Sequence, residues 1–333
     1  MTSVLELATP ALVVDADALR HNLEQMASDL PGTRCRPHVK AHKTTALARA
    51  QHGVGHTTFT CATPREVIGM ARAGLGDDLL LANEVLDPAR LTALAALDAR
   101  VTVAVDSLAT IAAAAAAGLR ECVVDVNVGL PRCGCEPGEA GRLAEEATRR
   151  GMTVRGVMGY EGHVVGLESR AERVRQTAEC MARLADAHDL VGGPLISAGG
   201  TGTYDINEVA TEIQAGSYAL MDTAYGALGL PFRRALSVHA TVISRNERDG
   251  YAVADCGLKA LGMDHGDPTV IGHTVWYCSD EHVTFGPETP VAVGDRVRVL
   301  PAHVDPTVAY HERMHLATGD EVVDAWDVDL RGW

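Results

Sequence analysis

The chain has 333 residues, a formal net charge of −15, 47% hydrophobic residues and 4% aromatic residues. This length predicts one large domain and one small one, and the apolar content suffices for a large core. The acidic balance, without a basic cluster, argues against nucleic acid and anionic membranes as partners. No segment is apolar and long enough to span a bilayer, and the N-terminus lacks a signal-peptide pattern, so we expect a cytoplasmic protein.

Eight cysteines are scattered along the chain. A chain of this length with a full core does not need a disulfide framework, so we expect free thiols. Several of them lie in apolar runs and are typical of buried thiols. The pair Cys133-x-Cys135 does not have the Cys-x₂-Cys spacing of zinc and redox sites, so we do not expect it to bind a metal.

The N-terminal part opens with a strand and a helix. Thr9-Pro10 precedes a short strand at 11–15, a helical pattern follows over 16–29, and Pro31-Gly32 ends it. Short apolar strands then alternate with amphipathic helices, which is typical of parallel α/β folds. The expected strands are 35–40, 58–61, 78–82, 101–106, 122–127, 154–159, 195–198 and 213–221, and the expected helices are 44–52, 64–73, 88–97, 107–117, 139–150 and 169–189.

Eight strands with crossovers predict an α/β fold of the (β/α)₈ TIM-barrel type. The alternative is an open doubly wound sheet. The strand count and the absence of Gly-x-Gly-x-x-Gly after the first strand favour the barrel. Ser107 and Pro64 stand where an N-cap and a first helical turn prefer such residues, which supports the helices that begin there.

After about Arg234 the pattern changes to short alternating runs separated by Gly and Pro turns. Such runs without long helices predict a small antiparallel β domain, which the strand at 11–15 can join. The expected runs are 237–244, 250–255, 269–273, 282–285, 296–300 and 321–329. We therefore expect a barrel domain at 16–234 and a β-strand domain made of 1–15 plus 235–333.

The stretch Arg36-Pro37-His38-Val39-Lys40-Ala41-His42-Lys43 places a lysine at the end of the first predicted barrel strand. In a barrel, chemistry gathers at the C-terminal ends of the strands. Partial desolvation and neighbouring cations can lower the pKa of a lysine at this place, so that Lys40 acts as a nucleophile toward an aldehyde cofactor. The alternative is an ordinary solvated lysine.

The loop Ser197–Tyr204 follows the seventh predicted strand and is rich in glycine and threonine. Glycines expose backbone N–H groups and threonines add hydroxyls, so the loop can cradle an anion without a basic side chain. Barrels often bind phosphate in the loops after strands seven and eight. The alternative is a plain glycine-rich turn. The candidate phosphate-binding residues are Gly200, Thr201, Gly202 and Thr203, with Gly216, Ser217 and Tyr218 from the eighth predicted strand.

The segment His303-Val304-Asp305-Pro306-Thr307 is a candidate metal site in the small domain. His303 and Asp305 are two residues apart, so on an extended segment their side chains point the same way. Imidazole plus carboxylate suits a divalent ion such as Mn²⁺, Zn²⁺ or Mg²⁺. The alternative is a polar turn before a proline.

His311-Glu312-Arg313-Met314-His315 matches the HExxH string of zinc metalloproteases. That string acts only on a helix that presents both histidines to one zinc ion. Here it lies in a β-rich stretch near the C-terminus, so we do not expect a protease, although His311 could lie near the ion at His303.

Other candidates carry a weaker signal. Tyr160 could cover a cofactor ring, and His163 could shuttle a proton. Arg132, after the fifth predicted strand, could bond a phenolate or a ring nitrogen. Asp280-Glu281-His282 could reach an active site, including that of a partner subunit. Each has an alternative as an ordinary surface residue.

These residues resemble the D-threonine aldolase and D-serine dehydratase group of fold-type III pyridoxal phosphate enzymes, which are relatives of alanine racemase. The resemblance runs from Thr9-Pro10 to Arg331-Gly332-Trp333 and so covers nearly the whole chain. Its most specific pieces are Arg36–Lys43, Ser197–Tyr204, Gln214–Tyr218 and His303–Thr307.

The resemblance implies an N-terminal barrel, a C-terminal β domain and a homodimer with active sites near the subunit interface. It implies that pyridoxal 5'-phosphate is bound covalently to Lys40 and that its phosphate rests on the loop at 200–202. It also implies that His303 and Asp305 hold a divalent metal, with Mn²⁺ expected and Mg²⁺, Co²⁺ or Zn²⁺ as alternatives. Ring contacts by Arg132 and Tyr160 are carried over from the same resemblance.

The residue at 305 bears on the reaction. Dehydratases of this group tend to have His-x-Cys at the metal position and aldolases His-x-Asp, so Asp305 implies an aldolase. The expected activity is that of a carbon–carbon lyase of the D-threonine aldolase type, which cleaves a D-β-hydroxy-α-amino acid to glycine and an aldehyde. A metal-bound water or His163 would take the hydroxyl proton.

Several alternatives to this reaction remain. The chain could be a D-serine or 3-hydroxy-D-aspartate dehydratase, with Lys40 as the base that removes the α-proton, or a 3-hydroxy-D-aspartate aldolase. A racemase needs no metal on the β-oxygen. A pyridoxal phosphate carrier of the same barrel type has no second domain. The predicted β domain with His303 and Asp305 therefore disfavours this alternative.

Overall fold

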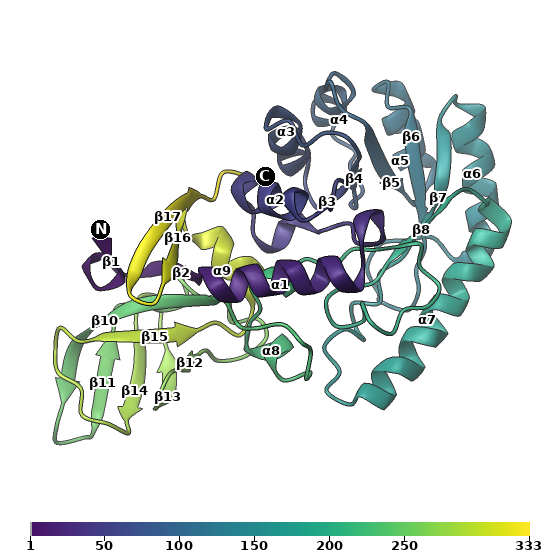
Figure 1. The fold of residues 1–333 in the computed structure, drawn as a ribbon. Coiled ribbons are helices and arrows are strands. Elements are labelled where there is room, and N and C mark those ends of the chain that lie inside the picture. Colours follow the sequence, from purple (N-terminus) through teal and green to yellow (C-terminus); the bar gives the residue numbers. More distant parts are fainter. Residues whose placement is uncertain (1) are drawn as a thin grey trace. The chain divides into compact units, whose positions relative to one another are not determined.

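The computed structural model describes residues 2–333, and the chain divides into two compact units (Figure 1). The barrel unit comprises residues 26–40, 47–216 and 330–333, and the β unit comprises residues 2–25, 41–46 and 217–329. Lys40 and Gly216, two of the predicted cofactor-binding residues, lie at boundaries between the units along the chain. Each is the last residue before the chain enters the β unit.

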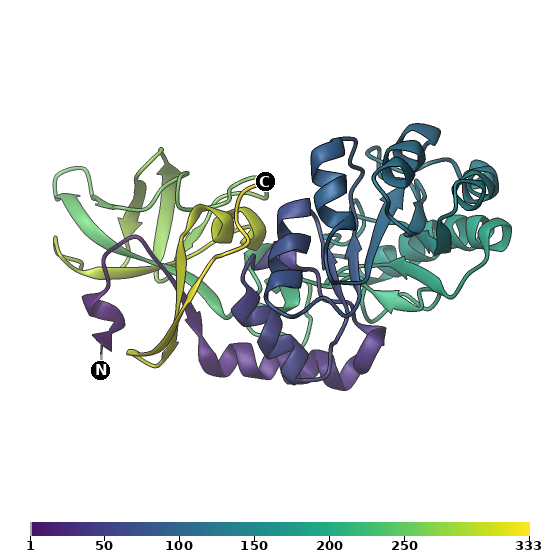
Figure 2. The ribbon, with the colours of Figure 1, turned by 90° about the horizontal axis from the view of Figure 1, so that it is seen from above.

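A curled parallel sheet of seven strands forms the centre of the barrel unit, with helices packed around it (Figures 1 and 2). Each strand pairs in parallel with the next one in the chain. The strands are mostly buried along their length, as parallel sheets covered on both faces are. They are β3 (Phe59–Cys61), β4 (Leu79–Leu81), β5 (Val101–Val105), β6 (Glu121–Asp125), β7 (Thr153–Met158), β8 (Leu195–Ala198) and β9 (Glu212–Ile213).

The predicted first strand is not a regular strand, and the expectation for 35–40 is corrected here. Residues 35–38 lie between the two edges of the sheet, with single parallel bridges to Ile213 in β9 and to Thr60 in β3. Pro37 has no N–H, so it cannot complete a ladder, although its carbonyl accepts a hydrogen bond from the amide of Thr60 at 2.9 Å. The chain then tightens into the 3₁₀ turn η3 (Val39–Ala41). The segment therefore joins the two edges of the curled sheet.

The predicted eighth strand is also shorter than expected. Only β9 (Glu212–Ile213) is regular, and the predicted strand 213–221 gives way to the 3₁₀ turn η5 (Ser217–Ala219). The carbonyl of Ala215 accepts a hydrogen bond from the amide of His38 at 3.0 Å. The residues after β9 therefore pair with the irregular segment 35–38, which cannot support a longer ladder.

Helices follow the strands of the barrel unit as the sequence predicts. Thr63 caps one of them, with Pro64 in the first turn, and Ser107 caps another in a capping box with Thr110. The capping side chains accept hydrogen bonds from N–H groups that have no partner within the helix. None of the helices among residues 2–333 is long and apolar enough to cross a membrane. The helices are α2 (Thr45–Gly53), α3 (Pro64–Arg72), α4 (Pro88–Ala95), α5 (Leu108–Ala116), α6 (Ala140–Arg149) and α7 (Arg170–Val191).

A buried charge network closes the barrel unit at the N-terminal ends of its strands. Arg36 donates to Glu212 at 2.8 Å and to Asp78 at 3.1 Å. Arg155 donates to both oxygens of Asp78, at 2.8 and 2.7 Å. Asp78 precedes β4 and Arg155 lies in β7, which are not neighbours in the sheet, so these two side chains meet across its interior. The hydrophobic cluster of Leu80, Ala104, Val123 and Met158 adds to the core of the same sheet.

The network shifts the titration of Asp78. Burial alone raises the pKa of this carboxyl, but hydrogen bonds from Arg155 and the charge of Arg36 outweigh burial and leave its pKa below the ordinary value. Because the folded-state pKa is lowered, the carboxylate contributes stability that is complete above the pKa of the unfolded chain. This contribution is lost as the pH falls through the folded-state pKa.

We predict that Asp78→Asn lowers the free energy of unfolding by about 3–5 kcal/mol at pH 7, because it leaves two buried guanidinium groups without their shared carboxylate. The variant should also lose less stability than the parent chain as the pH falls below about 4, because the contribution of the Asp78 carboxylate declines from the pKa of the unfolded chain downward. Urea denaturation followed by circular dichroism measures both effects. Asp77→Asn, an exposed neighbour, is the matched control. Equal denaturation midpoints for the two variants would contradict the prediction.

The β unit is built on a ten-stranded sheet. Its pairs are antiparallel except for β2 with β16, which are parallel. The predicted strand at 11–15 is β2 (Ala11–Asp15), which pairs with β10 and β16, and α1 (Ala16–Asp29) follows it as predicted. The other strands are β1 (Thr2–Ser3), β10 (Leu236–Asn246), β11 (Tyr251–Ala254), β12 (Thr269–Val270), β13 (His273–Cys278), β14 (Val283–Pro287), β15 (Arg296–Leu300), β16 (Arg313–Thr318) and β17 (Glu321–Asp327).

Two elements near the C-terminus differ from the expectation. The segment predicted to be extended at 303–307 becomes helix α9 (Val304–Tyr310), with His303 as its N-cap. Residues after α9 form β16, which the sequence analysis missed. His311 ends the helix and His315 lies in the strand, so the HExxH string is not on one helix. The rejection of a metalloprotease site is therefore confirmed.

The cysteines are free thiols, as predicted, and all except Cys133 and Cys278 are buried. Burial raises the pKa of the Cys122 and Cys135 thiols to about 12 in each case. A thiol with so high a pKa is a poor nucleophile and a poor metal ligand at neutral pH. Of the Cys-x-Cys pair, only Cys135 is a buried part of the packing.

Candidate functional site

Lys40 lies in the turn η3, directly after the segment that joins β9 to β3. Its amide N–H contacts Nδ1 of His38 at 3.4 Å, and its side chain is half-buried. Because the segment runs parallel to β3, Lys40 stands at the C-terminal ends of the strands, where barrels place their reactive groups. The bridges of residues 35–38 therefore fix the backbone that carries the amine.

The glycine-rich loop after β8 (Leu195–Ala198) is a tight turn with little room for side chains. Gly199 has φ +79°, a conformation that favours glycine. A Cβ atom on Gly202 would lie 1.8 Å from the carbonyl oxygen of Val165. The amide of Gly200 donates to the hydroxyl of Thr203 at 3.2 Å. The loop is thus packed closely against Val165 and braced by Thr203, and its phosphate-binding role stays a prediction.

Glu161, which the sequence analysis missed, holds this loop in place. Its side chain is fully buried, and it accepts hydrogen bonds from the Thr203 hydroxyl at 2.7 Å and from the Gly199 amide at 3.3 Å. Burial raises the pKa of Glu161, while these hydrogen bonds lower it. The signal for it was a carboxylate between glycines directly after β7 (Thr153–Met158), beside the tyrosine that the sequence analysis did select.

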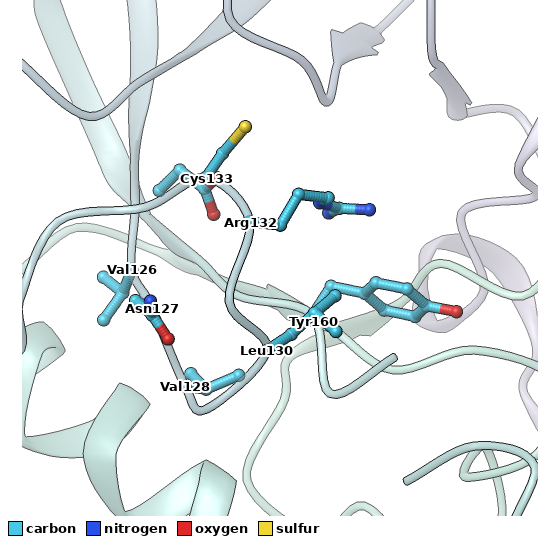
Figure 3. A pocket seen from close by; sticks show the side chains of 8 residues that line it. Val126, Asn127, Val128, Leu130, Arg132, Cys133 and Tyr160 are labelled. Carbon is cyan, nitrogen blue, oxygen red and sulfur yellow. The ribbon is translucent and has the colours of Figure 1, made fainter. Parts of the chain in front are cut away.

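Arg132 and Tyr160 lie side by side in a pocket of the barrel unit, and both extend in the same direction (Figure 3). The Arg132 guanidinium carbon is 5.4 Å from the centre of the Tyr160 ring, within the range of a cation–π contact. A Cβ atom on Gly200 would lie 3.5 Å from the same ring. The structure therefore brings together three of the predicted cofactor-binding residues, from the loops after β6, β7 and β8.

A pair of carboxyl groups lies beside this pocket and was also missed. Asp125 ends β6 (Glu121–Asp125) and is buried. Burial, and then the charge and hydrogen bond of Glu84, raise the pKa of Asp125 well above its ordinary value, and the charge of Arg132 opposes the shift. Residues 84 and 125 follow different strands, so only the fold reveals that they are neighbours. The shift favours the neutral form of the Asp125 carboxyl.

His163 is placed less favourably for proton transfer. Its Nε2 atom lies 3.8 Å from the sulfur of Cys180 in α7 (Arg170–Val191), and its ring packs near Gly129. The side chain is exposed. These contacts are with α7 and with the loop after β6 rather than with the glycine-rich loop. Its role as the base stays a prediction.

The β unit holds the other predicted residues. Ser217 contacts Asp305 through its hydroxyl at 3.3 Å, and Tyr218 is buried with its ring 5.5 Å from that of Phe232. Asp305 lies in the first turn of α9, and the carboxylate of Asp222 accepts the amide of Val304 at 2.9 Å. Burial raises the pKa of Asp222, and the amides that it binds lower it. Asp222 thus fixes the start of the helix that carries Asp305.

His303 is surrounded by groups that the sequence did not predict. Its Nδ1 atom lies 2.9 and 2.8 Å from the two carboxylate oxygens of Asp264. The ring of His265 stacks on it with centres 3.8 Å apart and planes within 10°. Ligand atoms of these three residues lie within 4.8 Å of one another. Nothing in the spacing could have indicated this, because the partners are remote in the chain. The pairing of His303 with Asp305 stays a prediction, and its extended geometry is replaced by a helix start.

The weaker candidates of the β unit make structural contacts. Nε2 of His311 lies 2.9 Å from the carbonyl oxygen of Ala260, and burial lowers the pKa of this histidine. Asp280 and Glu281 form exposed ion pairs with Lys259. Exposed pairs of this kind contribute little stability. A role for these residues near a site stays a prediction.

The chain matches two family models. The alanine racemase N-terminal domain matches residues 14–223, and the serine dehydratase domain matches residues 235–317. The first covers most of the chain, so it establishes the family as well as the type of fold. The parallel barrel followed by a mostly antiparallel sheet agrees with it.

Similar proteins share nearly the full length of the chain. A D-threonine aldolase from Arthrobacter sp. is 33% identical, and a 3-hydroxy-D-aspartate aldolase from Paracoccus denitrificans is 32% identical, each over 98% of this chain and 93% of the relative. The crystal structure of D-threonine aldolase from Filomicrobium marinum is 33% identical with a TM-score of 0.92, and the match covers 99% of this chain and 96% of that one.

A dehydratase is also similar. The structure of D-threo-3-hydroxyaspartate dehydratase from Delftia sp. HT23 is 26% identical with a TM-score of 0.89, and the match covers 100% of each chain. A variant of that dehydratase has been solved in a metal-free form. With both aldolases above 30% identity over almost all of its length, the chain belongs to the alanine racemase-like family, in the group that includes D-threonine aldolase and 3-hydroxy-D-aspartate aldolase.

Proposed function

We propose that the chain is a metal-activated, pyridoxal 5'-phosphate-dependent aldolase that cleaves D-β-hydroxy-α-amino acids of the D-threonine type to glycine and an aldehyde. The observation that carries the proposal is Asp305, because the family resemblance implies His-x-Asp in aldolases of the group, whereas its dehydratases tend to have His-x-Cys. The identity to two aldolases supports it. Mn²⁺ is the proposed ion, and a homodimer the proposed assembly.

The residues of the barrel unit suit pyridoxal phosphate. The amine of Lys40 can bond its aldehyde, and the glycine-rich loop at 199–203 is the proposed phosphate site, although the amides of Gly199 and Gly200 already donate within the protein. A side chain at Gly202 would collide with the carbonyl of Val165, so only glycine allows the loop to pack this closely against Val165. When bound, the cofactor accepts the electrons released as the Cα–Cβ bond breaks.

The residues of the β unit suit a divalent cation. The Nδ1 side of His303 faces Asp264, which leaves Nε2 as the ligand atom. A carboxylate from Asp305 completes a nitrogen–oxygen pair of the kind that Mn²⁺ accepts. Such an ion supplies a Lewis acid for the β-hydroxyl of the substrate.

The chain's own residues have distinct roles in this proposal. Lys40 bonds the cofactor, and Glu161 holds the loop that grips its phosphate. Tyr160 and Arg132 supply a ring and a positive charge beside that loop. The base that accepts the hydroxyl proton is His163 or a water molecule on the ion, as the sequence analysis predicts.

We expect the purified protein, with pyridoxal phosphate and Mn²⁺, to convert D-threonine to glycine and acetaldehyde. Liquid chromatography with D-threonine, D-serine and 3-hydroxy-D-aspartate side by side measures the products. Aldehyde and glycine from D-threonine support the proposal. Formation of 2-oxobutanoate and ammonia instead would show a dehydratase. A strong preference for 3-hydroxy-D-aspartate, with glycine as product, would show the aldolase named for that substrate.

Lys40→Ala should abolish the visible absorbance of the bound cofactor, because no other amine is proposed to bond its aldehyde. Activity should fall by at least about 10³-fold, in keeping with the loss of a covalent step. Lys259→Ala, at an exposed ion pair in the β unit, is the control. If the Lys40 variant keeps the absorption band, another residue holds the cofactor.

Chelation of the metal with EDTA should stop turnover but leave the cofactor absorbance unchanged. The reason is that the proposed metal ligands, His303 and Asp305, lie in the β unit, whereas Lys40 and the glycine-rich loop lie in the barrel unit. Activity should return when Mn²⁺ is added back. Full turnover in EDTA, after a dialysis that removes all metal detectable by mass spectrometry, would refute the metal assignment.

A further inference from the structure

We propose that Asp264 and His265 are positioning residues that hold the imidazole of His303 in one tautomer and one plane, so that Nε2 is presented to the cation. The inference rests on the proposed metal site. It concerns two residues that the sequence did not indicate and that need not touch the ion themselves.

The contact between His303 and Asp264 is the first support. Both carboxylate oxygens of Asp264 lie within 2.9 Å of Nδ1 of His303. A carboxylate only accepts hydrogen bonds, so Nδ1 carries the proton in this contact. A neutral imidazole has one N–H group, which puts the lone pair on Nε2. Histidines that bind metals commonly donate their other N–H to a carboxylate in this way.

The stacked ring of His265 is the second support. The planes of the two imidazoles differ by only 10°. The His303 side chain is 17% exposed and that of Asp264 is 57% exposed. The flat contact with His265 therefore restrains a ring that solvent reaches from one side, while Asp264 sets its rotation.

The backbone around these residues keeps Asp264 at this distance. Gly262 pairs with His303 in an antiparallel bridge, and its amide donates to the Thr307 hydroxyl at 2.8 Å. That hydroxyl in turn donates to the carbonyl of His303 at 2.7 Å. A Cβ atom on Gly262 would lie 2.3 Å from Pro306. The segment that carries Asp264 and His265 is therefore fixed against the start of α9.

Direct ligation is the alternative, because Asp264, His265 and His303 could together surround an ion. In that arrangement Nδ1 of His303 would face the ion and lose its hydrogen bond to Asp264. The two arrangements differ in which substitutions are tolerated. An amide at 264 can still accept a hydrogen bond from Nδ1, and a phenyl ring at 265 can still stack, but a phenyl ring cannot replace an imidazole ligand, and an amide is a weaker ligand than a carboxylate.

The test is the affinity of the full-length holoenzyme for Mn²⁺, measured by isothermal titration calorimetry after removal of metal. Asp264→Ala should weaken binding by about 10–100-fold, as is typical when the partner of a metal-binding histidine is removed. Asp264→Asn should recover most of that loss. His265→Phe should bind as the parent chain does, whereas His265→Ala should bind more weakly. Asp267→Asn, an exposed acid nearby, controls for net charge.

A second readout is the tautomer of His303 in the metal-free protein, measured by long-range ¹H–¹⁵N nuclear magnetic resonance. The parent chain should have its proton on Nδ1, and Asp264→Ala should move the population toward Nε2–H. An unchanged tautomer, or equal losses of affinity for His265→Phe and His265→Ala, would overturn the inference.

His303→Ala separates this inference from the proposed function. If it binds Mn²⁺ like the parent chain, the proposed metal site is wrong and the inference falls with it. If it loses the ion while Asp264→Ala does not, only the positioning role is wrong.

Discussion

The position of Lys40 depends on the short segment before it, which is hydrogen-bonded on both sides. Residues 35–38 take hydrogen bonds from one edge of the parallel sheet and give them to the other. The side chain of Arg36, in the same segment, donates hydrogen bonds to Glu212 and Asp78. An amine at the end of a free loop would sample many positions. Restricting it to the one position that a reaction needs would cost conformational entropy. Here the backbone is fixed before a ligand arrives.

Buried carboxylates repeat this arrangement elsewhere. Glu161 accepts N–H and O–H groups of the glycine-rich loop, and Asp222 accepts the amides at the start of α9 and α8 (Thr223–Gly226). In both cases burial raises the pKa of the carboxyl and the hydrogen bonds oppose the rise. A buried acceptor that satisfies main-chain donors specifies one loop conformation, because a shift of the loop would leave polar groups without partners.

Local sequence signals predicted most of the fold. Apolar periodicity located the parallel strands, and caps such as Ser107 marked helix starts, because these features act over a few residues. Predictions from the sequence were wrong where tertiary contacts determine the local conformation. Pro37 prevented a ladder in the first strand, and the chain around His303 became a helix start although it reads as extended.

The candidate site was predictable in part for the same reason. Glycine loops and a lysine at a strand end are local patterns, so Lys40 and the loop at 199–203 could be selected from the sequence. The contacts of Asp264 with His303 and of Glu84 with Asp125 join residues about forty positions apart. Only the folded chain reveals such pairs.

The two units are interleaved along the chain, which crosses between them after Gln25, Lys40, Ala46, Gly216 and Asp329. No single cut yields either unit intact, so a truncation meant to isolate the barrel would also remove strand β2 or helix α1 from their context. A gene fragment for one unit alone could therefore not be exchanged between proteins. A contiguous stretch exchanged between such chains would carry parts of both units with it.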